Sequence, residues 1–432
     1  MKASKYNFLY TNVLKDNNLS VIYNSRTGAL ATLEPDKSGS LQNFMENGVD
    51  IKDREFAEQL YECGILVYDD FDELKQIKMD LLTSRFDTSN MNLTITPTMD
   101  CNFRCTYCFE KGEYHKQKIT QETIDKLIDF VEMRAHELRN LSVGWFGGEP
   151  LLAMSQIVNI SERLQSICRD NGITYSSTII TNGYLLTARI AKKLKHYGVE
   201  RVQITIDGLH DIHNKRRPLK SGEGTFDTIL SNLSEAKGII PIAVRINIDK
   251  ENYGNVDEII DIFKERGLLE NDVHPYLGHV DSFNDQYDKH KCLSKETYSK
   301  INLQFMKKND LPLMNIYPKQ RGFYCGADQN SSWAIDSQGD LYKCYCEIGK
   351  ETHKIASLYN LDIINPSLLH DYMLHSPPDD ARCKNCKYLP ICMGGCPHLR
   401  IKNTTTCDQH KYMLDDYLYE CAKTLLSQSM SD

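Results

Sequence analysis

The sequence has no apolar run long enough to cross a bilayer. Its longest runs, such as SVGWFG at 142–147 and PIAVRI at 241–246, are far shorter than the roughly 20 residues that a spanning helix needs. The N-terminal MKASKYNFLY lacks the apolar core and the small-residue cleavage site of a secretory signal. No fixed-period repeat and no long low-complexity segment is present. We therefore expect a folded, cytoplasmic protein that has no membrane partner.

Positive charge is in short supply, with 51 Lys and Arg against 59 Asp and Glu and a net charge of −8. General nucleic-acid binding usually needs a basic footprint, so we expect no nucleic-acid partner. Two local basic stretches stand out, KKLKH at 192–196 and NKRRPLK at 214–220. We interpret the first as a solvated helix face, and Arg216 and Arg217 in the second as surface charge.

Cysteine, in contrast, is abundant, with 15 residues. Disulfides are disfavoured in the cytoplasm, where clustered cysteines more often bind metal or take part in chemistry. Most of them fall in two clusters, at 101–108 and 325–407. The remaining four are interpreted as buried or incidental thiols: Cys63, Cys168, Cys292 and Cys421.

The length of 432 residues predicts two or three domains. Residues 1–90 combine short alternating runs with helical patterns at 40–47, 53–66 and 71–86, which is typical of a winged-helix-like unit. Residues 91–317 alternate strand and helix patterns, and six such units favour a partial (β/α)6 barrel with its chemistry at the C-terminal strand ends. The candidate strands lie at 91–99, 141–147, 175–183, 201–208, 242–249 and 273–280. Residues 318–432 have little apolar periodicity, and metal clusters are another source of order there.

Three cysteines in the first cluster follow the first candidate strand, in the segment CNFRCTYC at 101–108. Thiolates suit zinc or iron–sulfur clusters, and a structural zinc site usually has four ligands. Three thiolates on a 4Fe–4S cubane leave one iron open to a small molecule. The spacing of Cys101, Cys105 and Cys108 thus predicts such a cluster.

This segment resembles the CxxxCx(aromatic)C motif of the radical S-adenosylmethionine enzymes, with Tyr107 as the aromatic residue. In that family the open iron binds the amino and carboxylate groups of S-adenosylmethionine. The resemblance implies cofactor contacts for the GGEP segment, which meets the methionine amino group, for a ribose-contacting threonine, and for an arginine and an asparagine near the carboxylate. These residues are Gly147, Gly148, Glu149, Pro150, Thr205, Arg245 and Asn247.

The second cluster follows the pattern CX13GX4C, then CX2CX5CX3C and a final cysteine, and it resembles the SPASM domain. That resemblance implies two auxiliary 4Fe–4S clusters, and hence three clusters in all. The distal cluster would be held by Cys383, Cys386, Cys392 and Cys407. The cluster nearer the barrel would be held by Cys325, Cys344 and Cys396, with either Cys346 or an open iron at the fourth position. Zinc binding by the paired cysteines is the less favoured alternative.

Residues 1–90 resemble the recognition element of enzymes that modify ribosomally made peptides, which adds a leader peptide to a sheet edge. A plain structural cap is the alternative. The resemblances together imply a maturase that removes a hydrogen atom from a precursor peptide and forms thioether crosslinks, as sactipeptide and ranthipeptide maturases do. Its partners would be the precursor peptide with its leader and an electron donor of the flavodoxin or ferredoxin type. The sequence identifies no catalytic residue.

Three other functions stay open. Carbon–carbon or carbon–oxygen crosslinking would use the same parts. Formylglycine formation is disfavoured because sulfatase maturases typically carry an acidic base directly after the GX4C cysteine, where this chain has Tyr345. A non-catalytic iron–sulfur or zinc protein is the last alternative. We assign no role to Glu110, interpret Asp207, Gly208, His210 and Asp211 as an ordinary turn, and expect Trp145 in the core.

Overall fold

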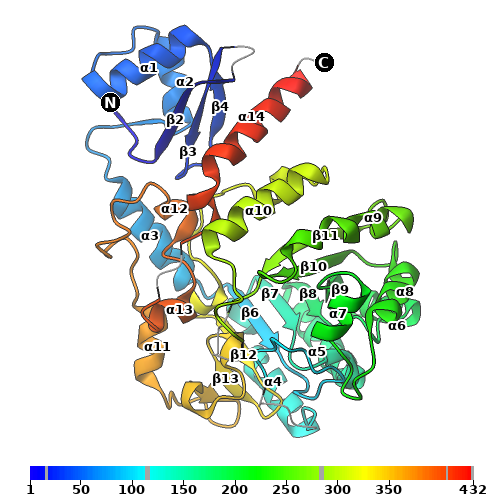
Figure 1. The fold of residues 1–432 in the computed structure, drawn as a ribbon. Helices are drawn as coiled ribbons and strands as arrows, with labels where there is room; N and C mark the ends of the chain where they lie inside the picture. Colours follow the sequence, from blue (N-terminus) through cyan, green and yellow to red (C-terminus); the bar gives the residue numbers. More distant parts are fainter. Residues whose placement is uncertain (15–17, 112–116, 282–286, 405–406, 430–432) are drawn as a thin grey trace. The chain divides into compact units, whose positions relative to one another are not determined.

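The computed structural model describes residues 1–14, 18–111, 117–281, 287–404 and 407–429 (Figure 1). By their packing, these residues form two compact units. One unit comprises Met1–Arg85, Lys295–Cys325 and His375–Asp432, and the other comprises Phe86–Ser294 and Gly326–Leu374. The expected functional division at residues 90 and 317 stays a prediction. In the part of the chain described, no helix is both long and apolar enough to cross a membrane.

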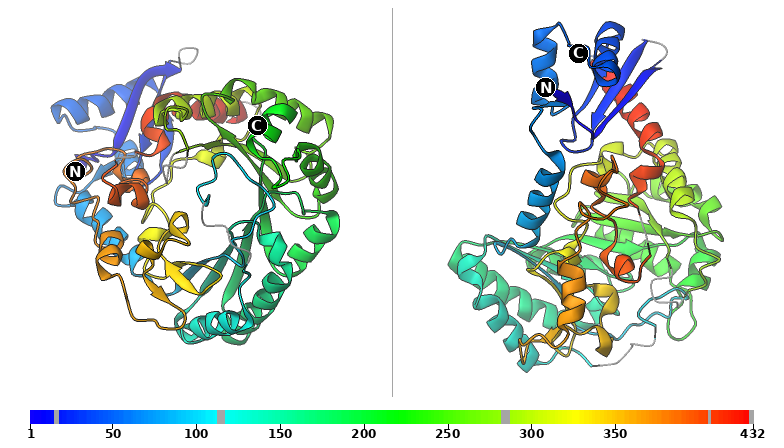
Figure 2. Two further views of the ribbon diagram at one scale, coloured as in Figure 1. Left: turned by 60° about the horizontal axis from the view of Figure 1, so that its bottom comes forward. Right: turned by 90° about the vertical axis from the view of Figure 1, so that its left-hand side faces the viewer.

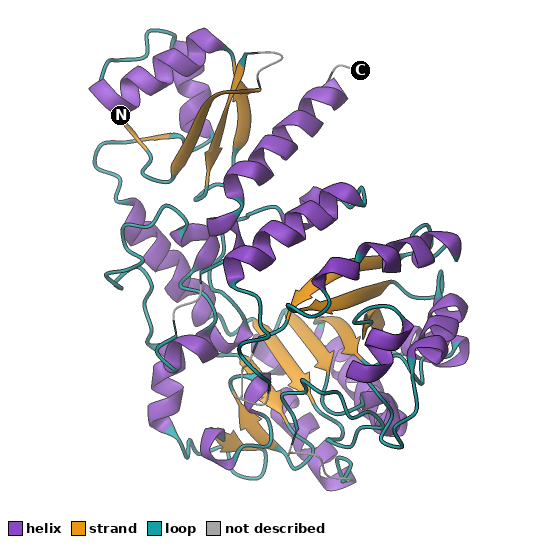
Figure 3. Ribbon diagram, viewed as in Figure 1, coloured by secondary structure: helices purple, strands orange, loops and turns teal. Residues whose placement is uncertain are grey.

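The unit with residues 86–294 is built on a largely parallel sheet (Figure 3). The strand order of this sheet is β11-β10-β9-β8-β7-β6-β12-β13-β14. Six of its strands are parallel and follow one another in chain order: β6 (Asn90–Ile95), β7 (Asn140–Trp145), β8 (Thr174–Ile180), β9 (Val199–Thr205), β10 (Ile242–Ile248) and β11 (Val273–His279). The predicted α/β fold is therefore confirmed. Parallel strands end at one edge, so residues at their C-terminal ends are brought together.

Helices connect these strands and cover the outer face of the sheet (Figure 2, left). They are α4 (Gln121–Glu132), α5 (Met154–Asn171), α6 (Ala188–His196), α7 (His210–Arg216), α8 (Phe226–Ala236) and α9 (Asp257–Glu265). Apolar residues at helical spacing explain the packing: α5 buries Ile157, Ile160 and Leu164. The predicted solvated face of α6 is also found, since its lysines are exposed and Leu194 is buried.

Part of the cysteine-rich region extends this sheet beyond the six predicted strands. Strand β12 (Ser332–Ile335) pairs in parallel with β6, and β13 (Asp340–Tyr342) and β14 (Ala356–Ser357) follow it. The unit also holds α11 (Pro366–Met373). Trp145, at the end of β7, is fully buried, as expected for a core residue.

The other unit begins with three antiparallel strands, β2 (Asn7–Leu14), β3 (Leu19–Asn24) and β4 (Leu30–Leu33), followed by α1 (Pro35–Asn47), α2 (Arg54–Glu62) and α3 (Glu73–Arg85). The helix expected over 53–66 ends early because Gly64 takes a left-handed conformation with φ 74°. Strand β5 (Leu66–Val67) follows and pairs with β1 (Lys2–Ala3).

Later segments complete this unit: α10 (Lys295–Lys308), α12 (Leu389–Cys392), α13 (Pro397–Ile401) and α14 (Leu414–Ser429). On α14, Tyr417 and Leu418 pack in one core cluster with Phe8 and Val21 of the three-stranded sheet. In a second cluster, Ile77 and Leu81 of α3 join Leu389 and Met393 of the cysteine-rich segment. The N-terminal and C-terminal segments therefore share apolar cores.

Candidate functional site

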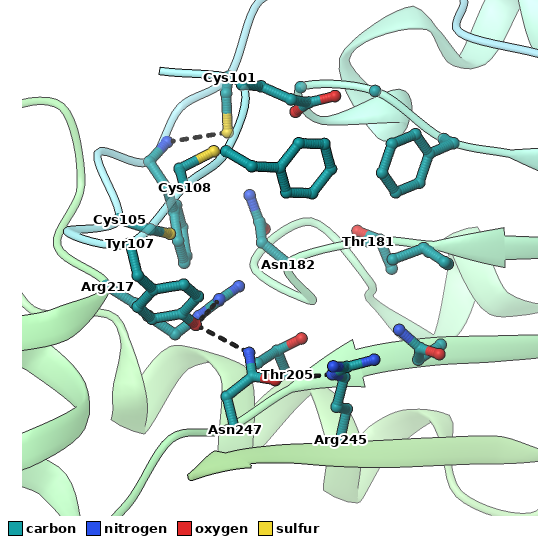
Figure 4. Close-up of a pocket in the computed structure, with 18 of the residues that line it drawn as sticks. Cys101, Cys105, Tyr107, Cys108, Thr181, Asn182, Thr205, Arg217, Arg245 and Asn247 are labelled. Atoms are coloured by element: carbon teal, nitrogen blue, oxygen red, sulfur yellow. Dashed lines mark hydrogen bonds between the residues drawn. The ribbon is translucent and has the colours of Figure 1, made fainter. Parts of the chain in front are cut away.

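A cavity of about 230 Å³ lies at the C-terminal strand ends of the parallel sheet. All of its lining residues belong to the unit with residues 86–294 and 326–374. Cys101, Cys105 and Cys108 line it together, from the loop that follows β6 (Figure 4). The structure therefore brings the three cysteines of CNFRCTYC to one cavity.

The loop that carries these cysteines is held by backbone hydrogen bonds to the end of α7. Arg104 N donates to Pro218 O at 2.9 Å, and Thr106 N donates to Arg216 O at 2.9 Å. Burial raises the pKa of the Cys101 thiol, and the carboxylate of Glu149 and the two neighbouring cysteines raise it further. As thiolates the three sulfurs would repel one another, and the cationic core of an iron–sulfur cluster would offset that repulsion.

Two glycines allow the end of β7 to lie directly against the backbone that enters this loop. Gly147 has a φ of 107°, and a Cβ on Gly148 would lie 2.3 Å from Asp100 O. The amide of Glu149 donates to that same oxygen at 2.8 Å. Both glycines line the cavity. Any side chain at 148 would displace the cysteine loop, so here glycine serves the packing of the protein itself.

Glu149 and Pro150 are buried behind the cavity and do not line it. The Glu149 carboxylate accepts hydrogen bonds from Thr181 Oγ1 at 2.7 Å, from Asn182 N at 2.8 Å and from Leu151 N at 3.0 Å. Burial raises its pKa despite these donors. This side chain joins the end of β7 to the end of β8. The TNG segment that contributes Thr181 and Asn182 to the cavity was not among the predicted site residues.

The other predicted cofactor residues share the cavity lining, namely Tyr107, Thr205, Arg245 and Asn247. Three of them are linked by hydrogen bonds. Arg245 Nε donates to Asn247 Oδ1 at 2.6 Å, and Asn247 Nδ2 donates to the Tyr107 hydroxyl at 3.1 Å (Figure 4). Arg217, which also lines the cavity, donates to the same hydroxyl at 2.6 Å.

The interpretation of Arg216 and Arg217 as surface charge is wrong. Their exposed fractions are 6% and 7%. Arg216 reaches Asp249 Oδ2 at 2.6 Å and Asp207 Oδ2 at 3.4 Å, and both carboxylates are fully buried. Asp207 thus belongs to a buried ion pair and not to an ordinary turn. Burial alone would raise the pKa of Asp249, but hydrogen bonds from Tyr287 and Arg216 lower it below its usual value.

His213 on α7 fixes the position of this arginine pair. Its Nδ1 accepts from Asp207 N at 3.2 Å, its Nε2 lies 3.1 Å from Thr225 Oγ1, and that hydroxyl donates to Arg217 O at 2.8 Å. An acceptor role for Nδ1 requires the neutral ring with its proton on Nε2. Burial and then the two arginine charges lower the pKa of His213 well below its usual value, which agrees with this tautomer.

One wall of the cavity is aromatic. The Phe109 and Phe146 rings stack with centroids 6.1 Å apart, and Tyr345 meets Phe146 at 5.1 Å. Tyr345 begins η6 (Tyr345–Glu347), directly after Cys344. Glu110 also lines the cavity, and burial raises the pKa of its carboxyl to about 7. The sequence assigned no role to Glu110 or to Phe109.

Four cysteines of the second cluster lie close together in the other unit. Burial, Asp380 and then Cys386 and Cys407 raise the pKa of the Cys383 thiol. Burial raises that of Cys392 to about 12, and Asp408, Cys407 and Cys383 contribute to the rise. Hydrogen bonds reach two of the sulfurs, from Asp408 N to Cys392 at 3.3 Å and from Lys411 Nζ to Cys407 at 3.5 Å. The set predicted for the distal cluster is thus brought together.

The set predicted for the nearer cluster draws on both units and stays a prediction. Cys325 and Cys396 belong to one unit, and Cys344 and Cys346 to the other. Cys346 lines the cavity next to Tyr345. Over the described residues, no group of three or more Cys, His, Asp or Glu side chains is arranged around a single metal ion. The ligands of a cubane bind four different irons, so these side chains lie further apart than the ligands of a single metal ion.

The parallel sheet carries three cysteines on the loop after its first strand, beside a cavity at its C-terminal edge. These features are typical of a class of barrel enzymes that hold a cluster at the strand ends. Residues 95–263 match the model of the Radical SAM superfamily. The chain is an enzyme that is similar to this superfamily over these residues. This similarity implies a 4Fe–4S cluster and S-adenosylmethionine.

Among curated proteins, the chain is similar to a cysteine-type anaerobic sulfatase-maturating enzyme of Clostridium novyi (strain NT). The two are 25% identical over 345 residues, which is 71% of this chain and 88% of the relative. A probable GTP 3',8-cyclase of Sulfurisphaera tokodaii is 29% identical over 283 residues, 62% of this chain and 86% of that protein.

Two solved structures share the fold. One is native anSMEcpe with bound AdoMet and the Kp18Cys peptide, with a TM-score of 0.61 and 19% identity over 78% of this chain and 99% of that one. The other is SuiB of Streptococcus suis bound to its precursor peptide SuiA, with a TM-score of 0.55 and 15% identity over 93% of this chain and 96% of that one. At these identities the likeness concerns the fold alone.

Proposed function

We propose that this enzyme is a peptide maturase that joins a cysteine sulfur to a carbon atom within a ribosomally made precursor peptide. The observation that carries the proposal is the position of Tyr345. It lines the cavity directly after Cys344, where sulfatase maturases typically carry an acidic base. A phenol at this position argues against formylglycine formation. The likeness in fold to a protein solved with its precursor peptide, over 93% of this chain, supports a peptide substrate.

The residues of the cavity fit the implied cofactors. Cys101, Cys105 and Cys108 would hold the first cluster, because their sulfurs are soft donors grouped at one wall. The cavity also offers open backbone at Gly147 and Gly148, the hydroxyl of Thr205, and the guanidinium of Arg245. These groups complement the ammonium, ribose and carboxylate of S-adenosylmethionine, with Asn247 assisting. Glu149 and Pro150 would contribute by holding this backbone in place.

Bound together, the cluster and S-adenosylmethionine supply a 5′-deoxyadenosyl radical that removes a hydrogen atom from a substrate carbon. The protein's part is to position the substrate and to exclude water. Tyr107, fixed by Arg217 and Asn247, holds the cluster loop against β10. The rings of Phe109, Phe146 and Tyr345 give the cavity an apolar wall.

The rest of the chain would hold the further clusters and bind the leader peptide. The distal cysteines and those of the nearer set would hold two further 4Fe–4S clusters. Crosslinking would remove two electrons and two protons from the peptide. One of each leaves as the hydrogen atom, the cysteine thiol loses the second proton, and the cysteines of the nearer set would hold a cluster able to accept the second electron. A flavodoxin or ferredoxin would act as the electron donor in the cytoplasm. An exposed edge of the β2-β3-β4 sheet would bind the leader peptide as an added strand.

The test uses enzyme reconstituted without oxygen, S-adenosylmethionine, a reductant and a cysteine-containing peptide encoded beside the enzyme. Intact mass and free thiols of the peptide are measured. We expect the loss of two hydrogens and of one free thiol for each crosslink. Loss of hydrogens with every thiol still free would favour carbon–carbon or carbon–oxygen crosslinking instead. Production of 5′-deoxyadenosine with an unchanged peptide would reject this substrate class.

A further inference from the structure

The lining of the cavity includes a cluster of aromatic rings and a buried acid. Tyr345, Phe109 and Phe146 contact one another at centroid distances of 5.1 to 6.3 Å. Glu110 follows Phe109 in the chain and lines the same cavity. Tyr345 remains 49% exposed, so its ring extends to solvent at the wall. Aromatic faces next to a carboxylate favour a ligand with an apolar stem and a cationic head.

Among the residues that the structure describes, none forms a hydrogen bond or an ion pair with the carboxyl of Glu110. Its exposed fraction is 6%, and its Oε1 is fully buried without a hydrogen bond to any residue that the structure describes. Buried carboxylates are normally paired with a cation or several donors. Glu110 still lines the cavity, so a ligand there that donates to its carboxyl would supply a partner.

The arginines that line the cavity are not cationic partners of Glu110 among the described residues. Arg217 donates to Tyr107, and Arg245 donates to Asn247. Over the described residues, neither guanidinium forms an ion pair with Glu110 within 4 Å, and both are engaged with the groups near β10. The cavity lining thus combines cationic and amide groups with an acidic side chain and a cluster of aromatic rings.

We infer that Glu110, with Phe109, Phe146 and Tyr345, binds a lysine or arginine side chain of the substrate peptide. The inference rests on the proposed function, because it assumes a peptide substrate. The aliphatic stem packs on the rings, and the head donates to Glu110 in a charge-assisted hydrogen bond. Binding there would fix a cationic residue of the peptide beside the three-cysteine loop. The crosslinked carbon would then lie on this residue or close to it in sequence.

The ammonium of S-adenosylmethionine is a rival for Glu110, although the backbone at Gly147 and Gly148 offers it another site. The two possible ligands of Glu110, the ammonium of S-adenosylmethionine and a side chain of the substrate, predict different losses in a Glu110→Gln variant. If Glu110 binds the substrate, the variant keeps the change that S-adenosylmethionine causes in the electron paramagnetic resonance spectrum of the reduced cluster. Loss of that change in the variant would overturn the inference.

The main experiment compares two short probes, acetyl-Gly-Lys-Gly-amide and its norleucine counterpart, which has a similar stem but no ammonium. Binding to the reduced holoenzyme with S-adenosylmethionine is followed by the paramagnetic broadening of each probe's ε-proton signals. We expect the lysine probe to bind about 10-fold more tightly or better, as one charge-assisted hydrogen bond allows. Glu110→Gln should abolish this preference.

The matched control is Glu122→Gln, an exposed acid on α4, which should keep the full preference. A second variant, Tyr345→Leu, tests the wall without changing Glu110 and should weaken binding of the lysine probe several-fold. Equal binding of both probes by the unaltered enzyme, or a preference that survives Glu110→Gln, would overturn the inference. The readout is binding, so it is separate from the crosslinking assay: a lysine preference without any crosslink would count against the proposed reaction alone.

Discussion

Arg217 Nη1 donates a hydrogen bond to the hydroxyl of Tyr107 over 2.6 Å. Tyr107 is the aromatic residue of the cysteine loop, and Arg217 lies at the end of α7, 110 residues further along the chain. Asn247 donates to the same hydroxyl from β10. One phenol oxygen therefore joins the cysteine loop to two later elements of the barrel. This role depends on the hydroxyl and not on the ring.

Tyr107→Phe should thus be more harmful than the loss of an exposed hydroxyl. The change leaves two buried donors without their acceptor, which costs about 1–3 kcal/mol. We expect a lower melting temperature and weaker binding of S-adenosylmethionine, measured by thermal denaturation and by titration of the reduced cluster's spectrum. Tyr253→Phe, at a side chain that is 45% exposed, is the control and should change neither. Equal behaviour of the two variants would show that the ring alone matters.

Arg216 gives a second prediction, because it neutralises two buried carboxylates, Asp207 and Asp249. Arg216→Met removes the cation and leaves both acids buried. Breaking a buried ion pair from one side costs about 3–5 kcal/mol, so we expect a large fall in thermal stability. Lys215→Met changes the neighbouring exposed side chain and should shift the melting temperature little. A small effect at Arg216 would contradict the prediction, because the two acids would then not depend on this cation.

Because His213 is buried, we expect the stability of the folded protein to depend on pH. Its pKa in the folded protein is far below the value of about 6.5 expected when unfolded, so below that pH the unfolded chain binds more protons. Its contribution is fully present above about pH 6.5 and is lost as the pH falls towards the folded pKa. His213→Asn keeps an acceptor for Asp207 N, and it should give lower stability at pH 8 but a weaker decline towards about pH 5.5.

Thermal denaturation across this pH range checks the prediction. His196→Asn is the control, because its side chain is exposed on α6 and should leave the decline unchanged. The decline in the unaltered protein also includes other groups, so the comparison concerns the difference between the two variants. An identical decline in both would reject a neutral, buried His213.

The sequence was sufficient to predict the strands and the cysteine loop, because the patterns that identify them lie within short segments. Apolar alternation marks β6 to β11, and spacing alone unites Cys101, Cys105 and Cys108. Arg216 could not be interpreted correctly in this way, because its partners lie 9 and 33 residues away and meet it only in the fold. In the same way, the sequence did not show which groups within the protein bind the carboxylate of Glu149. Its donors at Thr181 and Asn182 come from the next strand end.

The last prediction concerns the cysteines outside the barrel loop. Cys383 and Cys386 lie near Cys407 and Cys392, so replacing both Cys383 and Cys386 by alanine should abolish the distal cluster. Iron analysis after reconstitution should find about four fewer irons per chain, because a cubane carries that number. The optical absorbance of the clusters should fall in proportion.

The matched control is the double replacement of Cys168 and Cys421, two buried thiols that lie outside both cysteine clusters. It should leave the iron content unchanged, although the buried positions make a modest loss of stability expected. Zinc in place of iron in the unaltered protein, lost on replacing Cys383 and Cys386, would favour the zinc alternative for this segment. An unchanged iron content in that variant would remove these two cysteines from any cluster.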